Sequence, residues 1–304
     1  MKESSVPKRW LDQAAGLRQL VTTPTCRTVS LSGGRGDAGT TTLVINLAAA
    51  LAERERQVVV LDEFTGLHNI PHRLHLAAGF ELGHVLRREV SLFDTLIESQ
   101  YGFGILPIAA QPHLLANLNE GEQRWLAAEF EQLTEPLDYL LLDTRPAMAQ
   151  NVPSLSLAAD DVVIVLSNRA ESLTDAYACI KQLATEYARR DFRVLVNRVA
   201  SLGEAMTLFD RVRAVAQQYL GEEIQLKLIG YVPEDEWLNR ATRLGRPVLE
   251  AFPDAEASAA IRQLADAMLR WVPPRQSNGT MASIIYRLIE SSKIVAERIP
   301  HGSH

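Results

Sequence analysis

Short apolar runs alternate with amphipathic stretches along most of the chain. The runs are Arg27 to Leu31, Gln57 to Leu61, Phe103 to Pro107, Tyr139 to Leu142, Asp161 to Leu166, Phe192 to Val196 and Leu226 to Tyr231. The runs at 58–61 and 162–166 have no polar residue at every second position, which is typical of strands covered on both faces. The pattern predicts an α/β fold with a doubly wound, mainly parallel sheet, whose ligands bind at the carboxyl ends of the strands.

The same pattern divides the chain into three parts. One domain is expected over 26–271, and the region 1–25 is expected to hold a helix near Lys8 to Leu20 and a linker. A cluster of helix-breaking residues at 272–279 separates the domain from a C-terminal segment that ends at 304. Helical spacing returns within that segment, so 272–304 is predicted to be a linker followed by an amphipathic helix.

Composition narrows the functional classes. The formal net charge of -6 argues against strong nucleic-acid binding, because non-specific binding depends on Lys and Arg that neutralise phosphates. Cys26 and Cys179 are far apart in sequence, so neither a disulfide framework nor a cysteine metal site is expected. No segment resembles a signal peptide or is apolar over the length of a bilayer. These features indicate a cytoplasmic protein whose membrane contact, if any, is peripheral, at the inner face of the cell membrane.

A glycine-rich stretch lies where a phosphate-binding loop belongs, between the first apolar run and a helical pattern over Thr40 to Ala52. Residues 32–42 read Ser-Gly-Gly-Arg-Gly-Asp-Ala-Gly-Thr-Thr-Thr. Backbone N–H groups of such a loop, at a helix N-terminus, bind phosphates, and a lysine near the end of the loop supplies positive charge. Here Thr40 holds that position, and the chain has no lysine between Lys8 and Lys181.

The order and spacing of further segments resemble the MinD/ParA superfamily of deviant-Walker ATPases, in its FlhG branch, also called FleN or YlxH, from about Leu11 to Trp271. Besides the glycine loop, these segments are Leu43 to Ala48, Val60 to Asp62, Gly66 to Ile70, Leu141 to Thr144, Ser172 to Tyr177, Val194 to Arg198, Gly230 to Asp235 and Arg246 to Val248. The resemblance implies a P-loop fold, a role in flagellar number and placement, and ATP with magnesium as cofactors. No other cofactor is expected.

The loop departs from the pattern of the family, which is similar to Lys-Gly-Gly-x-Gly-Lys-Thr. The resemblance places Arg35 at the first lysine, Asp37 at the second glycine and Thr40 at the second lysine. Thr41 matches the hydroxyl that binds magnesium when nucleotide is present. Phe64 stands where the family has an aspartate that positions the attacking water.

Other positions keep the pattern of the family. The resemblance implies that Asp143 is the Walker B acid, that Asn197 reads the adenine edge and that Pro233 and Asp235 line the other side of the base. Arg145 departs from the pattern, because it replaces a small residue of the family, and it is a candidate substitute cation. The full set of nucleotide-binding positions it implies is Gly34, Arg35, Gly36, Gly39, Thr40, Thr41, Asp62, Asp143, Arg145, Asn197, Pro233 and Asp235. The alternative is that 33–39 form a tight turn between strand and helix and that strand ends simply favour such residues.

Phosphoryl transfer depends on positioning and on charge stabilisation, so the changes at Thr40 and Phe64 predict a pseudo-ATPase that acts through protein contacts. No residue is assigned a catalytic role with certainty. One alternative is a slow ATP-hydrolysing MinD-type switch that forms a homodimer, with Arg35 and Arg145 in place of the lysines. The other alternative is a partition-type ATPase associated with DNA.

The N-terminal segment Trp10 to Arg18 resembles the element through which this family engages FlhF, a GTPase. The matching residues are Asp12, Gln13, Leu17 and Arg18. An amide such as that of Gln13 can orient water in a GTPase site. A flagellar transcriptional activator or a switch-complex protein is a further expected partner. The alternative is an ordinary packing helix.

The C-terminal apolar positions follow helical spacing. They are Met281, Ile284, Ile285, Leu288, Ile289 and Val295. Relatives use a helix of this kind to touch the membrane, whereas the mixed charges of this one favour packing on the domain, and both interpretations stay open.

Three histidines, His68, His72 and His75, have a spacing similar to that of metal ligands. Pro71 is expected to interrupt any helix that would align them. Loop histidines without a metal are therefore predicted.

Overall fold

The computed structural model describes residues 26–33, 38–77, 79–108, 112–133, 137–144, 154–272 and 281–298. Its centre is an eight-stranded sheet in the order β3-β4-β2-β5-β1-β6-β7-β8. The strands are β1 (Arg27–Gly33), β2 (Val58–Asp62), β3 (Ile97–Glu98), β4 (Gly104–Pro107), β5 (Tyr139–Asp143), β6 (Asp161–Ser167), β7 (Asp191–Val199) and β8 (Gln225–Pro233). Every pair is parallel except β3 with β4. The predicted fold class is confirmed.

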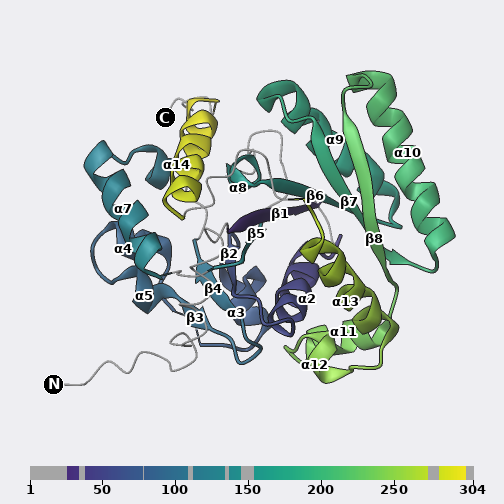
Figure 1. The fold of residues 1–304 in the computed structure, drawn as a ribbon, viewed down its shortest axis with the longest axis horizontal. Helices are drawn as coiled ribbons and strands as arrows, with labels where there is room; N and C mark the ends of the chain where they lie inside the picture. Colours follow the sequence, from purple (N-terminus) through teal and green to yellow (C-terminus); the bar gives the residue numbers. More distant parts are fainter. Residues whose placement is uncertain are drawn as a thin grey trace.

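Helices cover both faces of the sheet (Figure 1). They are α2 (Thr40–Ala52), η2 (Gly66–His68), α3 (Ile70–Arg73), α4 (Leu82–Leu86), α5 (Leu92–Thr95), α6 (Pro112–Ala116), α7 (Glu120–Leu133), α8 (Ser154–Ala158), α9 (Ala170–Tyr187), α10 (Leu202–Leu220), α11 (Glu236–Arg243), α12 (Val248–Ala251), α13 (Glu256–Leu269) and α14 (Met281–Arg298). Helices α7, α9, α10 and α14 share one hydrophobic core, and α2, α11, α12 and α13 share the other.

Strand β2 shows why the apolar runs lack alternation. Val59 and Leu61 pack into the core beneath α7 and α14, whereas Val58 and Val60 pack into the core beneath α2 and α13. Because both faces of the strand are covered, every one of its positions is buried. The same explanation applies to β5 and to all but the first residue of β6.

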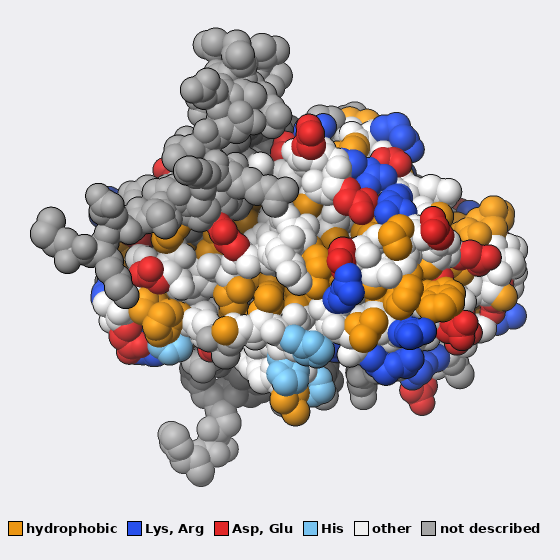
Figure 2. Space-filling view, turned by 90° about the horizontal axis from the view of Figure 1, so that it is seen from below, with side chains coloured by type: hydrophobic (Ala, Val, Ile, Leu, Met, Phe, Trp, Pro, Cys, Tyr) orange, Lys and Arg blue, Asp and Glu red, His pale blue; other side chains and the backbone are white. Residues whose placement is uncertain are grey.

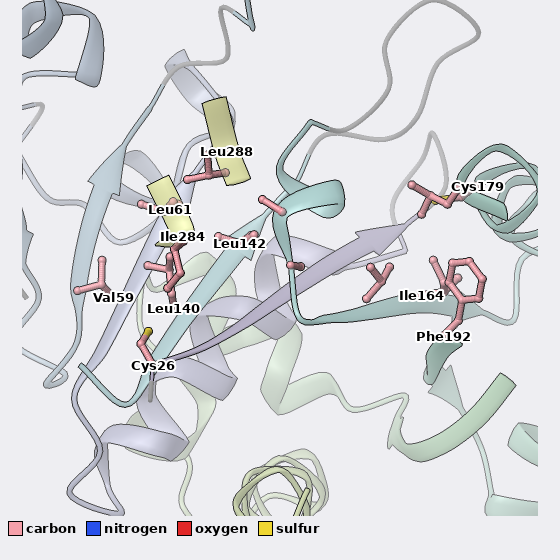
Figure 3. Close-up of a cluster of buried hydrophobic side chains, with 14 of the residues drawn as sticks. Cys26, Val59, Leu61, Leu140, Leu142, Ile164, Cys179, Phe192, Ile284 and Leu288 are labelled. Atoms are coloured by element: carbon pink, nitrogen blue, oxygen red, sulfur yellow. The ribbon is translucent and has the colours of Figure 1, made fainter. Parts of the chain in front are cut away.

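The C-terminal helix α14 packs on the domain. Ile284, Ile285, Leu288 and Ile289 are at most 4% exposed. Figure 3 shows Ile284 beside Leu140 and Leu142 of the sheet, with Leu288 above them. Of the two interpretations of this helix, the structure therefore shows the packed one.

A polar contact adds to this packing. Arg287 Nη1 lies 2.6 Å from the buried carboxylate of Asp160, which also accepts hydrogen bonds from the backbone and hydroxyl of Thr28. This ion pair connects α14 to the start of β1. Within the part of the chain that the structure describes, no helix is long and apolar enough to cross a membrane.

The order of the strands fixes where a ligand belongs. Strand β1 lies between β5 and β6, and the chain leaves β1 toward α2 on one face and returns from β5 to β6 on the other. Such a reversal opens a crevice at the carboxyl ends of the strands. In this chain the glycine loop follows β1 at that crevice.

Candidate nucleotide-binding site

The site is built around the N-terminus of α2. The helix begins at Thr40 and ends at Ala52, as predicted from its sequence pattern. Gly39, the residue before it, has φ 83°, a left-handed conformation that favours glycine. Gly33, at the end of β1, also requires glycine, because a Cβ atom there would collide with the Thr40 hydroxyl. The intervening positions Gly34, Arg35, Gly36 and Asp37 lie outside the described residues.

Asn197 holds the end of this loop. Its Nδ2 donates a hydrogen bond to the carbonyl oxygen of Ala38 at 2.8 Å, and its Oδ1 accepts one from the backbone N–H of Arg198 at 3.0 Å. The side chain is 2% exposed. The structure thus brings Asn197, at the end of β7, to the loop that precedes α2, as a shared site requires.

Two carboxylates lie side by side at the ends of β2 and β5. Asp62 and Asp143 are paired positions of the sheet. Asp62 accepts hydrogen bonds from the backbone N–H groups of Phe64 and Ile70, at 2.9 and 2.6 Å. Asp62 therefore fixes the turn between β2 and α3.

Asp143 differs from its neighbour. It is fully buried, and neither carboxylate oxygen has a hydrogen-bond partner among the described residues. Burial, followed by the charge of Asp62, raises the pKa of Asp143 well above its ordinary value, and the nearby Thr41 hydroxyl offsets this in part. Burial and the charge of Asp62 therefore outweigh the groups that would stabilise an ionised carboxylate at this place.

A buried carboxylate beside a hydroxyl fits magnesium, which is bound through oxygen ligands and usually keeps several waters. Thr41 and Asp143 therefore fit the cation that the resemblance implies. Thr40 does not fit the triphosphate in the same way, because its half-buried hydroxyl carries no charge. Phe64, half-buried, has no group that could orient a water molecule.

Pro233 and Asp235 lie at the end of β8. Pro233 is buried, and the two oxygens of Asp235 accept hydrogen bonds from the backbone N–H groups of Trp237 and Ala257, at 2.7 and 2.9 Å. Asp235 thus caps α11 and ties it to the start of α13. A role for these two residues beside a base stays a prediction.

The sequence interpretation missed Arg198 and Arg169. Both line a cavity of about 350 Å³, which Asn168, Glu234 and Asn239 also line. Arg198 directly follows Asn197 and has φ 59°, which is unusual for a residue with a side chain. The signals in the sequence were its place just after an apolar run and within the family-like segment Val194 to Arg198.

Three histidines were compared with metal ligands, and histidine side chains are visible on the face shown in Figure 2. Pro71 lies in the first turn of α3, where proline is tolerated, and this helix includes neither His68 nor His75. His68 lies in η2, His72 in α3 and His75 after it. In the described segments, no group of three or more His, Cys, Asp or Glu side chains could hold a metal ion.

Several predicted positions cannot be placed. Arg145, the predicted substitute cation, lies outside the described residues, as do Asp12, Gln13, Leu17 and Arg18.

Comparison with known proteins shows to which class of protein the chain belongs. An AAA domain family matches residues 26–194, which is the part that carries β1 to β6 and the first four residues of β7. The solved structure of the septum site-determining protein MinD complexed with Mg-ADP from Pyrococcus horikoshii has the same fold, with a TM-score of 0.59 and 22% identity over 81% of this chain and 96% of that one. Fold and family together define an AAA domain with the fold of MinD.

Curated relatives narrow the class further. The chain is 31% identical to the antiactivator FleN of Pseudomonas aeruginosa, over 90% of this chain and 97% of FleN. It is 24% identical to the flagellum site-determining protein YlxH of Helicobacter pylori, over 79% of this chain and 81% of that protein. The chain therefore belongs to the MinD/ParA family, in its FlhG branch.

Proposed function

We propose that this chain regulates flagellar number and placement through protein contacts and does not turn over ATP. Similarity to FleN over nearly the whole length of that protein supports the flagellar role. The observation that carries the second part is the composition of the site. The positions that would hold a cation, Thr41 and Asp143, are present, while an uncharged Thr40 and an aromatic Phe64 replace the groups that neutralise phosphate and orient water.

The consequence for chemistry follows from what phosphoryl transfer needs. Bound magnesium would neutralise part of the charge on a triphosphate, and Thr41 and Asp143 would hold it with its waters. Asp62 holds its turn through two backbone N–H groups, so it is committed to a structural task. The family has an aspartate at the position of Phe64 that orients the attacking water. Phe64 has no carboxylate, so nothing at this position can orient that water.

Partner contacts then carry the function. The expected partner is an FlhF-like GTPase, engaged by Asp12, Gln13, Leu17 and Arg18. A flagellar transcriptional activator or a switch-complex protein is the expected downstream partner, and a homodimer is an alternative assembly. We expect weak or no binding to nucleic acid, since the chain carries a net charge of -6 and its basic side chains are interspersed with acidic ones on the face in Figure 2.

The location we propose is cytoplasmic. A peripheral contact at the inner face of the membrane through α14 would require four buried apolar side chains, Ile284, Ile285, Leu288 and Ile289, to leave the core. Removing such side chains from a core costs several kcal/mol, about 1.5–3 for each. Binding of α14 to a membrane would have to compensate for this loss before the helix could leave the domain.

The test is stimulation of a purified FlhF-type GTPase by the full chain, measured without ATP. We expect stimulation by the unchanged protein, loss of stimulation with Gln13→Ala, and retention with Gln19→Ala, a matched amide in the same segment. Equal stimulation by Gln13→Ala and the unchanged protein would contradict the proposed contact.

A second candidate function is a slow ATP-dependent switch. The observation that favours it is Asp143, whose buried and unpartnered carboxylate suits a bound cation. Sustained phosphate release from Mg-ATP, lost with Thr41→Ala, would support this candidate over the first.

A further inference from the structure

A triphosphate at the N-terminus of α2 needs positive charge that Thr40 does not supply. The guanidinium group of Arg198 lies next to this place: its Nη2 is 3.9 Å from the position that a Cβ atom on Gly39 would occupy. We propose that Arg198 supplies the missing charge, so that the site binds a nucleoside phosphate through an arginine of β7 in place of a lysine of the loop. This inference shares one assumption with the proposed function, namely that the nucleotide site lies at this edge of the sheet.

The backbone at Arg198 directs its side chain. The register between β7 and β8 shifts here, because Asn197 pairs with Val232 and Val199 with Pro233, which leaves Arg198 as an extra residue. Such a bulge bends the strand and changes the direction of a side chain, often next to a ligand site. The bulge lies at the carboxyl end of β7, on the same edge of the sheet as the loop.

Arg198 also adopts a conformation that suits glycine better. Its φ is 59°, in the left-handed region, and the Asn197 side chain holds its backbone N–H. Residues kept in sparsely populated backbone conformations are concentrated at ligand sites. An arginine at such a position is explained if its guanidinium group has a task there.

The surroundings suit an anionic ligand. Arg198 and Arg169, which precedes α9, line the same cavity of about 350 Å³, with Glu234 as the one carboxylate among its described lining residues. A guanidinium group matches phosphate geometry by donating two parallel hydrogen bonds. The cavity lies between the carboxyl ends of β6, β7 and β8, where open α/β sheets bind ligands.

Arg198 could instead contact the base of the nucleotide, and binding measurements distinguish this role from contact with phosphate. A guanidinium group also stacks on flat rings, and Arg198 would then contact the base. In that case adenosine would depend on Arg198 as strongly as ATP does. Contact with phosphate predicts instead that dependence on Arg198 increases with the number of phosphates.

The experiment is calorimetry of the full chain with Mg-ATP, Mg-ADP and adenosine, for the unchanged protein and three variants. Arg198→Gly removes the guanidinium group at a position where glycine is favoured, so folding should be preserved, and its thermal unfolding is measured without ligand. Arg198→Gln removes the charge but keeps a side chain. Arg88→Gly is the matched control, because Arg88 also has a left-handed φ, 62°, and does not line the cavity.

We expect Arg198→Gly and Arg198→Gln to weaken ATP binding at least tenfold and ADP binding less, with adenosine within twofold. Arg88→Gly should bind all three as the unchanged protein does. An equal loss for adenosine, unchanged ATP affinity in both Arg198 variants, or no nucleotide binding by the unchanged protein at millimolar concentration would overturn the inference.

The proposed function can fail separately. If the unchanged protein binds no nucleotide but stimulates an FlhF-type GTPase, the inference alone fails. If the protein binds ATP through Arg198 and also releases phosphate, the proposal that it does not turn over ATP is contradicted, and the inference about Arg198 stands.

Discussion

Asn197 of β7 and Ala38 of the glycine loop are joined by a hydrogen bond, in which Asn197 Nδ2 donates to the Ala38 carbonyl oxygen at 2.8 Å. The contact is buried and joins residues 159 positions apart. It couples the end of one strand to the start of the helix that follows another. The position of Ala38, just before α2, therefore depends on a side chain from the second half of the sheet.

The first prediction is that Asn197→Ala destabilises the protein. The Ala38 carbonyl would lose its buried partner, and the expected loss in the free energy of unfolding is about 1–3 kcal/mol. Urea denaturation measures it. Asn239→Ala, at an exposed position of α11, is the control and should change stability by less than about 0.5 kcal/mol. Equal stability of the two variants would show that the bond contributes little.

The second prediction concerns Gly39. A Cβ atom there would lie 2.5 Å from Asn197 Nδ2, and φ is 83°. Gly39→Ala should cost about 1–3 kcal/mol from strain, with the collision in addition. Gly66→Ala is the control, since φ is 60° but nothing lies within 4 Å, so it carries strain without collision.

A double-mutant cycle separates these two contributions. In an Asn197→Ala background the collision disappears and the strain remains, so Gly39→Ala should cost less there than in the unchanged protein. Additive costs would mean that Gly39 and Asn197 do not interact as the structure places them.

The third prediction is a pH dependence from Asp143. Its pKa is raised well above the ordinary value by burial and by Asp62. The folded state then keeps a proton that the unfolded chain releases near pH 4, so the free energy of unfolding falls as pH rises from about 4 toward the raised pKa. Asp143→Asn removes this titration.

The variant should therefore show a flatter pH profile and should gain about 1–3 kcal/mol at neutral pH, where the raised pKa of Asp143 costs the folded state most. Denaturation at a series of pH values from 4 to 8 measures both effects. Asp254→Asn, at an exposed position, should leave the profile unchanged. An unaltered slope in Asp143→Asn would refute the assignment.

The fourth prediction tests the packing of α14. Ile284 is fully buried, so Ile284→Ala should cost about 2–5 kcal/mol. Ile294 lies on the same helix at 40% exposure, and Ile294→Ala should be close to neutral. If α14 were detached from the domain in solution, both variants would be as stable as the unchanged protein.

Periodicity was sufficient to predict the layers of the fold. All seven predicted strands and the Thr40 to Ala52 helix are present, because buried parallel strands and their covering helices have strong apolar patterns. The pattern could not predict β3, a two-residue edge strand at Ile97–Glu98 that pairs antiparallel and carries no periodicity. The order of strands, which brings Asp62 beside Asp143, was not predicted and came from the structure.

The site was predictable where a residue type has one clear task. Gly39 adopts a left-handed conformation before α2, and Asn197 contacts the neighbouring Ala38, while the nucleotide-binding role of both residues stays a prediction. Arg198 was not predicted, because its importance depends on a bulge and a left-handed backbone that the sequence does not announce. The choice between a membrane helix and a packed helix at α14 was open, since an apolar face of that width suits either environment.

The absence of ATP turnover is the central claim, and phosphate release by the purified full chain with Mg-ATP tests it most directly. The measurement is made alone and with an FlhF-type GTPase, beside Thr41→Ala, which removes the hydroxyl that would hold magnesium. The account predicts that the unchanged protein and Thr41→Ala release phosphate at the same background rate. Release by the unchanged protein that Thr41→Ala abolishes would contradict it.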